Sequence, residues 1–322
     1  MINPSKKQLI IIYSFAAILA VLYILSLTVF SKTVKSKKHI QQLQLLHEAD
    51  ISNIDIITIQ NGAAAVILTR TDNMWLIVNQ NDVNDRIPAD TQRLQKFFVL
   101  LVSKHNMTKA GKSDSSNGNA YGLDSDQATV ITLYKNGTAY EKLSFGALNF
   151  SQTERYFTTQ ELKSVYLAGQ EFDGFLNVSV QSWADPYIIS EQLKNDVFMM
   201  GEPQGISILY DRNSDGVLRQ AQEPQDNAVP EPVEGFDFEK LFDLRHGGFA
   251  ENLPAEQVLS FVIQMGDKST IQLDISQIIS DDNSVKSYLV KTTFDSERLQ
   301  KSVSYTTQIS QWTYSKISEM ML

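Results

Sequence analysis

An uninterrupted apolar stretch near the N-terminus constrains this chain more than any other feature. It runs from Gln8 to Ser31 without a charged residue, and lysines flank it at Lys6-Lys7 and again from Lys32 to Lys38. About twenty apolar residues cross a hydrocarbon core of roughly 30 Å as a helix, which satisfies its own backbone hydrogen bonds there. A signal peptide has a shorter apolar core and a cleavage site of small residues, so we expect an uncleaved transmembrane helix.

The orientation of this predicted anchor rests on the length of its N-terminal tail. Lysines flank both ends of the apolar run, so the difference in positive charge between the flanks is too small for the positive-inside rule to assign an orientation. The tail from Met1 to Lys7 is short and is expected to stay in the cytoplasm, while the rest of the chain is exported. The predicted localisation is therefore a bacterial cytoplasmic (inner) membrane, crossed once, with the C-terminal region outside the cytoplasm.

Charge and cysteine content narrow the classes of partner and site. Six of the 28 basic residues precede His39 and all 37 acidic residues follow it, so residues 39–322 carry a formal charge near −15. A nucleic-acid partner is not expected, because phosphate neutralisation needs clustered lysine and arginine. The chain contains no cysteine, which excludes disulfides, a lipidated cysteine and zinc sites built on thiolates.

The first half of the predicted exported region is rich in strand patterns. Runs of β-branched residues punctuated by turn residues predict a short meander, at Ile54 to Ile59, Ala65 to Leu68 and Trp75 to Val78. A helix should follow, opened by Pro88 and Asp90, because apolar residues then recur at i, i+3, i+4 and i+7. These residues are Leu94, Phe97, Phe98 and Leu101. Such a stripe must pack on the sheet.

Further strands are predicted after this helix. The polar stretch from Lys109 to Asn119 is expected to form a loop. A hairpin should follow, with strands at Ala128 to Tyr134 and Tyr140 to Phe145, because Asn136-Gly137 between such runs is a strong signal for a tight turn. Two short strands and an amphipathic segment complete the first half, at Arg155 to Thr158, Ser164 to Leu167 and around Phe172 to Leu176.

The second half repeats this order weakly. Gly205 to Asp211 corresponds to the first meander, and Phe236 to His246 corresponds to the helix, with Gly247 as its expected C-cap. Strands are predicted after it at Leu259 to Met265, Ser269 to Ile275, Ser287 to Thr293 and Ser302 to Ile309, before a closing helix from Trp312 to Met321. The predicted fold is α+β: an anchor region (1–38), then two units of mostly antiparallel sheet with packed helices (39–190 and 191–322).

One segment departs from this pattern, within residues 217–235. With suitable codons, one DNA sequence encodes Leu218 to Pro224, and its reverse complement, read in another phase, encodes Val229 to Gly235. The segment thus looks like a translated inverted DNA repeat. The segment resembles mobile palindromic elements found within bacterial reading frames. Its proline, glutamine and glutamate content cannot bury apolar surface, so we expect a solvated inserted loop. A proline-rich docking segment is the alternative.

The chemical motifs are weak. Asp211 to Gly216 matches the first half of a calcium-binding loop, but its twelfth position is Gln222 instead of a bidentate glutamate, and a polar turn explains it equally well. Gly111-Lys112-Ser113 lacks the first glycine of a phosphate-binding loop. The histidines show no metal-ligand spacing and no serine lies in a nucleophile elbow; the histidines are His39, His47, His105 and His246. We therefore assign no catalytic, cofactor-binding or metal residue.

A resemblance carries the functional prediction. The motifs that support it are W-x-I (Trp75 to Ile77), IPAD (Ile87 to Asp90), YGLD (Tyr121 to Asp124), Phe145-Gly146, RYF (Arg155 to Phe157), SVYL (Ser164 to Leu167) and Leu244 to Gly247. Their succession after an anchor helix resembles a bacterial family of unknown function whose members are single-span membrane proteins encoded beside gliding-motility-type ABC transporter subunits. None of these motifs is catalytic. Gly122 should permit a tight turn while Tyr121 and Leu123 seat the loop.

The resemblance implies a non-enzymatic accessory or scaffold subunit of an ABC-type transport complex. Its partners would be the membrane and the permease and ATPase subunits. The alternative is an enzyme of the cell envelope, such as a glycan hydrolase acting through paired carboxylates. A cleft with two facing carboxylates of perturbed pKa would favour the enzyme, and a filled core with an apolar surface patch would favour the binding subunit.

Overall fold

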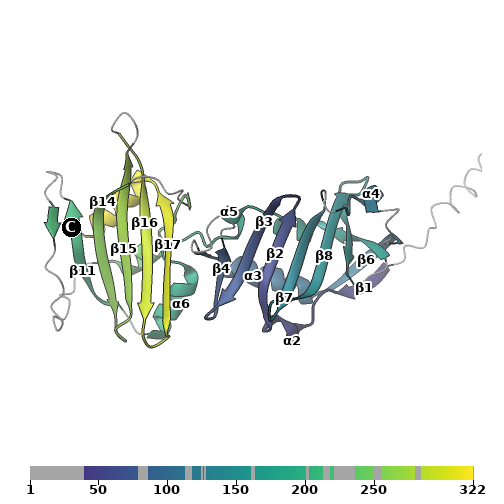
Figure 1. Cartoon of the computed structure of the whole chain (residues 1–322), viewed down its shortest axis with the longest axis horizontal. Coiled ribbons are helices and arrows are strands. Elements are labelled where there is room, and N and C mark those ends of the chain that lie inside the picture. Colours follow the sequence, from purple (N-terminus) through teal and green to yellow (C-terminus); the bar gives the residue numbers. More distant parts are fainter. Residues whose placement is uncertain are drawn as a thin grey trace, which may run out of the picture.

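The protein folds into two antiparallel sheets with helices packed on them (Figure 1). The structure, a computed structural model, describes residues 40–78, 86–112, 118–124, 126, 128–160, 164–200, 203–212, 218–220, 236–249, 255–279 and 284–321. The prediction of a mixed α+β protein with mostly antiparallel sheets is confirmed, since all pairings between the described strands are antiparallel.

The first sheet has ten strands in the order β1-β6-β10-β9-β8-β7-β2-β3-β4-β5. Its strands are β1 (Ile40–Gln44), β2 (Ile54–Asn61), β3 (Ala64–Thr71), β4 (Met74–Val78), β5 (Arg86–Pro88), β6 (Lys104–Lys112), β7 (Thr129–Lys135), β8 (Thr138–Leu148), β9 (Glu154–Thr159) and β10 (Ser164–Gly169). The helices of this part are α2 (Glu48–Ile51), α3 (Thr91–Val102), α4 (Gly118–Tyr121), the 3₁₀ turn η1 (Gln170–Phe175) and α5 (Val180–Trp183).

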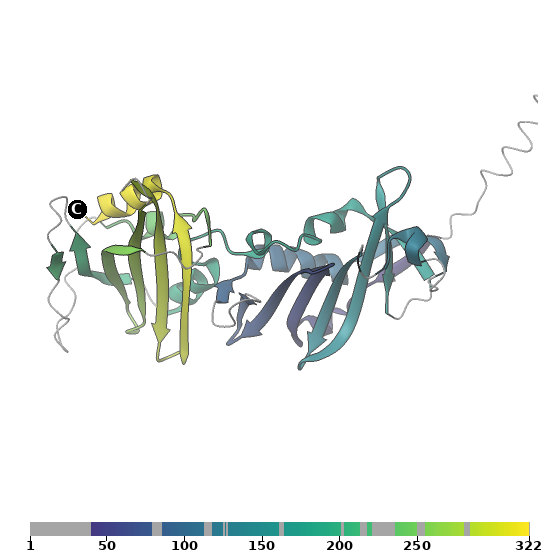
Figure 2. The same ribbon diagram turned by 45° about the horizontal axis from the view of Figure 1, so that its top comes forward.

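The second sheet has seven strands in the order β12-β11-β14-β15-β16-β17-β13. Its strands are β11 (Pro203–Arg212), β12 (Leu218–Gln220), β13 (Gly248–Phe249), β14 (Glu256–Met265), β15 (Thr270–Ile279), β16 (Val285–Ser296) and β17 (Lys301–Ile309). Its helices are α6 (Glu191–Met200), α7 (Phe238–Phe242) and α8 (Gln311–Met320), and α8 lies across the sheet in Figure 2.

The two sheets share one strand order. In the first sheet β6-β10-β9-β8-β7-β2-β3 are neighbours, and in the second β13-β17-β16-β15-β14-β11-β12 follow the same sequence of connections. Along the chain, helix α3 lies between the β2–β3 hairpin and β6, and helix α7 lies between the β11–β12 hairpin and β13. The first sheet adds β1 outside β6 and β4-β5 outside β3.

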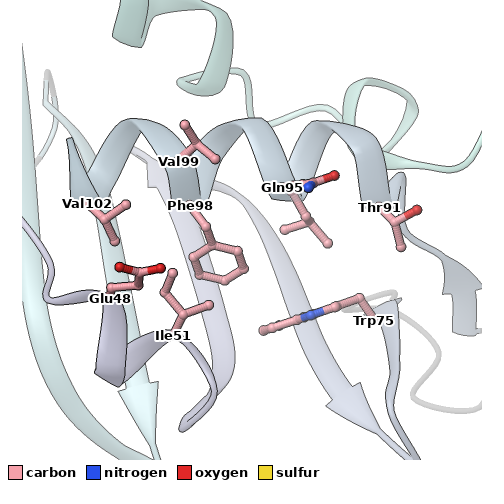
Figure 3. Close-up of a pocket in the computed structure, with 9 residues that line it drawn as sticks. Glu48, Ile51, Trp75, Thr91, Gln95, Phe98, Val99 and Val102 are labelled. Atoms are coloured by element: carbon pink, nitrogen blue, oxygen red, sulfur yellow. The ribbon is translucent and has the colours of Figure 1, made fainter.

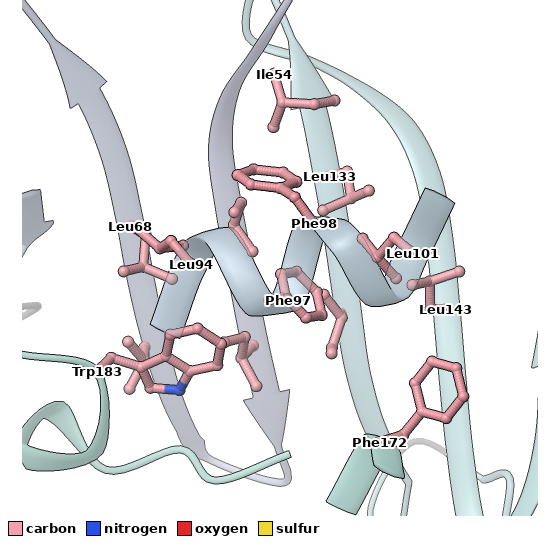
Figure 4. Packing of buried hydrophobic residues seen from close by; sticks show 14 of the residues in the cluster. Ile54, Leu68, Leu94, Phe97, Phe98, Leu101, Leu133, Leu143, Phe172 and Trp183 are labelled. Atoms are coloured by element: carbon pink, nitrogen blue, oxygen red, sulfur yellow. The ribbon is translucent and has the colours of Figure 1, made fainter. Parts of the chain in front are cut away.

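Helix α3 forms where its sequence pattern predicts it. The Asp90 side chain accepts a hydrogen bond from the backbone N–H of Arg93 at 2.9 Å, which caps the first turn. The buried residues of α3 are Leu94, Phe97, Phe98 and Leu101, the predicted stripe. Figure 4 shows this stripe facing strands that carry Leu68, Leu133 and Leu143. Truncating a buried phenylalanine such as Phe97 typically costs about 3–5 kcal/mol, so this contact is central to the fold.

Left-handed residues close the tight hairpins. Asn136 and Gly137 have φ of 50° and 70° and join β7 to β8, as predicted. Asp72 and Asn73 have φ of 49° and 62° and join β3 to β4 within the predicted meander. Short polar residues tolerate this conformation, and the resulting twist matches that of paired strands.

Three sequence expectations are corrected. The predicted helix from Phe236 to His246 is only the five residues of α7, and Asp243, not Gly247, is its C-cap. Lys109 to Lys112 belong to β6 instead of a loop, because their backbone pairs with β10. Helices α5 and α6 were not predicted. In the first two cases tertiary hydrogen bonding overrides the local pattern.

Two predicted features lie largely outside the described residues. The expected anchor from Gln8 to Ser31 is one of them, and no helix of the described residues is long and apolar enough to cross a membrane. Of the proposed insertion, residues 218–220 are described. They pair with Tyr210 to Arg212 as β12, so this part of the insertion is an edge strand and not a free loop.

Candidate functional site

The segment between the sheets is held by buried polar groups. The side chain of Gln192, on α6, accepts from the Trp75 N–H at 2.8 Å and donates to the Trp75 and Ala89 carbonyls, both at 2.9 Å. Met74 and Leu76 of β4 pack in the core of the second sheet. The chain thus joins its sheets through a packed seam instead of a simple linker.

Asp185 lies at the centre of this seam and is 2% exposed. Its carboxylate accepts from the backbone N–H groups of Tyr187 at 3.0 Å and Glu191 at 2.8 Å, and its own N–H donates to the Pro88 carbonyl at 2.9 Å. Burial raises the pKa of Asp185 to about 7, although the two N–H donors favour the charged form. Asp185 is therefore a buried carboxyl group that fixes the start of α6.

Residues from the end of α7 complete the seam. The Nε2 atom of His246 lies 2.7 Å from the Asp185 carbonyl oxygen and donates to it, since a carbonyl can only accept. Burial lowers the pKa of His246. Tyr187 forms a β-bridge with Arg245, and the His246 N–H donates to the Pro186 carbonyl at 3.1 Å. These contacts keep Leu244 to His246 extended and explain why α7 stops at Phe242.

The seam does not have the geometry of a hydrolase site. Asp185 has the raised pKa expected of a general acid, but both of its oxygens bind backbone N–H groups and its side chain is closed from solvent. Within the described ranges, no group of three histidine, aspartate or glutamate residues could hold a metal ion. The chemistry that the seam supports is positioning of one sheet against the other.

An open groove of about 410 Å³ lies between α3 and the short helix α2. Thr91, Gln95, Val99 and Val102 follow one side of α3, and the apolar lining also includes Ile51, Trp75, Leu94 and Phe98. Figure 3 shows Phe98, Ile51 and Trp75 turned toward the same space beneath the helix. The rings of Trp75 and Phe98 are 6.0 Å apart. The groove therefore offers an apolar floor along a helix about 18 Å long.

The groove has polar groups at its margin. Glu48 is the charged residue of its lining. The Arg70 guanidinium lies 5.9 Å from the centre of the Trp75 ring and donates to the Ser52 carbonyl, which holds the end of α2 beside β3. Val99 remains 56% exposed at the rim. An apolar surface with a few polar groups is typical of a binding site.

Several resemblance motifs meet at another place, at the end of β8. Gly122 has a φ of 63°, and a Cβ atom there would lie 2.8 Å from the Ala147 nitrogen. A Cβ atom on Gly146 would lie 2.2 Å from the Tyr121 carbonyl oxygen. Arg155 donates to the Gly146 carbonyl at 2.7 Å. The prediction that Gly122 permits a tight turn is confirmed, and the reason is close backbone contact.

The structure separates the other residues that the sequence interpretation singled out. Arg155, from the RYF motif, forms an ion pair of 2.8 Å with Asp173. Asp211 and Arg212 lie within β11, and the remainder of the possible calcium loop to Gly216 is outside the described residues. His105 contacts the Leu100 carbonyl at 2.7 Å and packs on Phe172. The seam residues Asp185 and Gln192 were missed. The Gln192 side chain bonds Trp75 and Ala89, more than 100 positions away, and the backbone of Asp185 bonds the distant Pro88 and His246.

Comparison with known proteins gives one distant relative. The chain is 24% identical over 156 residues to an uncharacterized protein of Treponema pallidum (strain Nichols), and the match covers 48% of each chain. The chain thus spans about half the length of this curated relative. No family model matches the chain. No solved structure matches it either.

Proposed function

We propose that this chain is a non-enzymatic, membrane-anchored accessory or scaffold subunit of an ABC-type transport complex of the gliding-motility kind. The observation that carries the proposal is the apolar groove beside α3, bordered by Trp75, Phe98 and Val99. Apolar surface left open to water is a marker of protein contact when it is contiguous and rimmed by polar groups. The resemblance of the sequence motifs supplies the kind of complex.

In the proposed architecture, two copies of one α+β unit (39–190 and 191–322) follow a single membrane anchor region (1–38) along the chain. The shared strand order of the two sheets supports the repeat. The seam through Gln192 and Asp185 supports a scaffold, because buried hydrogen bonds fix the second sheet against the first. A rigid pair of sheets can hold two partners at a set separation.

The envelope-enzyme alternative rests on Asp185 alone. Its raised pKa is the property of a general acid, but a glycan would have to reach a carboxyl group that is 2% exposed. Asp185→Asn should therefore leave any envelope hydrolysis by the purified chain unchanged. Loss of a measurable hydrolytic activity in this variant, with the fold retained, would favour the enzyme.

The proposed place of the chain is the bacterial cytoplasmic membrane, with residues after Lys38 outside. The long uncharged run from Gln8 to Ser31 supports a single membrane span at this place in the chain. Protease added to spheroplasts should digest the region after Lys38. Survival of that region until the membrane is lysed would reverse the proposed orientation.

A substitution in the groove tests the proposed function. Val99→Glu places a charge on an exposed rim position and should leave the fold intact while weakening association with the permease or ATPase. Lys96→Glu, an exposed position on the same helix outside the groove lining, is the matched control. If the transporter subunits copurify equally with the wild type, Val99→Glu and Lys96→Glu, the groove is not the surface that contacts them.

A further inference from the structure

The loop between β8 and β9 exposes apolar side chains at its tip. Phe150 has the largest exposed fraction of the described apolar side chains, 105% of its reference area, and Leu148 is 39% exposed. A phenylalanine is usually at least partly buried because its ring is large and apolar. The tip of this loop therefore presents apolar surface to whatever lies next to the molecule.

Hydrogen bonds hold this loop in one shape. The Asn149 side-chain oxygen accepts from the Thr153 N–H at 3.1 Å and the Ser151 hydroxyl at 3.0 Å. The Asn149 amide donates to the Glu154 carboxylate at 3.1 Å. Gln152 adopts a φ of 56°, and its carbonyl accepts from Gln170 at 3.2 Å. Because the loop is ordered before any contact, an encounter would lose little loop entropy.

The resemblance motifs form the base of this loop. Gly122 lies against Ala147, the residue that precedes Leu148. Arg155, directly after the loop, binds the Gly146 carbonyl and pairs with Asp173. The rings of Tyr121 and Tyr156 are 4.8 Å apart. Motifs without catalytic chemistry thus converge beneath an exposed aromatic residue.

The charge of the residues around the β8–β9 loop indicates what kind of partner surface the loop tip can contact. The segments 121–124, 147–155 and 170–175 contact one another here, and they carry four acidic residues and one basic residue, Arg155, which pairs with Asp173. Anionic lipid headgroups would be repelled by this charge. A protein surface with basic side chains around an apolar pocket is complementary to it.

We propose that Leu148 and Phe150 form a docking tip that inserts into an apolar pocket bordered by lysine or arginine side chains on another protein. This inference rests on the proposed function, because it assigns a second contact surface to the scaffold. Phe150 is the anchor in the pocket, and the acidic residues around the loop orient the partner. Central aromatic anchors of this kind dominate many protein interfaces.

Photo-crosslinking in the native membrane tests the docking tip. The full-length chain would carry p-benzoylphenylalanine at position 150 or, as a control, in place of Trp312, an aromatic residue on α8 that is 67% exposed. Position 150 should give one discrete protein adduct whose crosslinked peptide contains basic residues, and position 312 should not give that adduct. Adducts to lipid alone, no adduct at 150, or the same adducts at both positions would overturn the inference.

Copurification of this partner separates the inference from the function on which it rests. Phe150→Ser should lower the yield of the copurified partner at least tenfold, whereas Phe150→Leu and Trp312→Ser should keep it. All three variants should melt as wild type, because the exposed rings stabilise little. If the transporter complex stays intact with Phe150→Ser, the docking tip is contradicted but the proposed accessory function is not. If the wild-type chain forms no complex, both the docking tip and the accessory function are contradicted.

Discussion

Gln192 hydrogen-bonds both backbone groups of Trp75, with its side-chain oxygen 2.8 Å from the Trp75 nitrogen and its side-chain nitrogen 2.9 Å from the Trp75 oxygen. The two residues are 117 positions apart. The amide of Gln192 lies where the β4–β5 ladder ends and couples it to the first turns of α6. A single side chain from the second half thereby bonds the backbone of β4 in the first sheet.

Replacing Gln192 by leucine should destabilise the protein by about 2 kcal/mol. The change keeps the side-chain volume but leaves the Trp75 N–H and the buried Ala89 carbonyl without this partner, and an unsatisfied buried polar group costs about 1–3 kcal/mol. Denaturant unfolding of the described region measures the effect. Gln92→Leu is the control, since Gln92 is exposed and bonds only Glu191, and it should change the stability by less than about 0.5 kcal/mol. Equal stabilities of the two variants would mean that the Gln192 bonds contribute nothing.

Gly122→Ala should destabilise the base of the β8–β9 loop by about 2 kcal/mol. The new Cβ would meet the Ala147 nitrogen at 2.8 Å, and the φ of 63° is unfavourable for alanine. Gly174→Ala is the matched control, because nothing lies within 4 Å of its Cβ position. Thermal unfolding of both variants distinguishes them. A Gly122 variant that melts with wild type would show that the turn relaxes without cost.

Asp185 should make the protein more stable as the pH falls. Burial raises its pKa from 3.8 to about 7 in the folded protein, so the folded state binds the proton more tightly than the unfolded state. This contribution is fully present below pH 3.8 and is lost as the pH rises to about 7; it amounts to at most about 4 kcal/mol. His246 acts in the opposite direction, because its lowered pKa removes stability as the pH falls below 6.5.

The sign of the Asp185 effect can be isolated by comparing variants. In a His246→Gln background, the free energy of unfolding should decrease between pH 5 and pH 7.5, and adding Asp185→Asn should flatten that slope. Urea titrations at four pH values would measure both slopes. An unchanged slope after Asp185→Asn would show that this carboxyl group ionises normally in the folded protein.

Removing residues 221–234 should leave the fold intact. The segment lacks apolar periodicity, and the deletion keeps β12, which pairs with β11. The free energy of unfolding should change by no more than about 1 kcal/mol, the scale expected for an exposed loop. Loss of the cooperative melting transition would reveal that these residues pack on the rest of the protein.

The sequence predicted those elements whose determinants are local. The stripe of α3 and the Asn136-Gly137 turn depend on neighbouring residues, and both are observed. The end of α7 depends on Leu244 to His246 bonding to the segment near Pro186, so the local helical pattern was misleading there. The polar residues of β6 gave no strand signal because backbone pairing with β1 and β10 holds them.

The candidate surfaces were harder to predict for the same reason. Gln192 and Asp185 look like ordinary polar residues in the sequence, and they are buried only because distant segments, with Ala89 for Gln192 and Pro88 and His246 for Asp185, bond to them. Phe150 gives no sequence sign of its exposure, which depends on the shape of the loop. The YGLD motif did predict the tight turn at Gly122, whereas the close backbone contacts of Gly122 and Gly146 became visible only in the structure.

Native mass spectrometry of the gently extracted full-length chain tests the central claim most directly. The account predicts an assembly that contains this chain together with an ABC permease or its ATPase, and Val99→Glu should shift it toward the free chain. The opposite result is the wild-type chain running alone while the transporter subunits of the same cell form a complete complex without it. That result would contradict the accessory-subunit account.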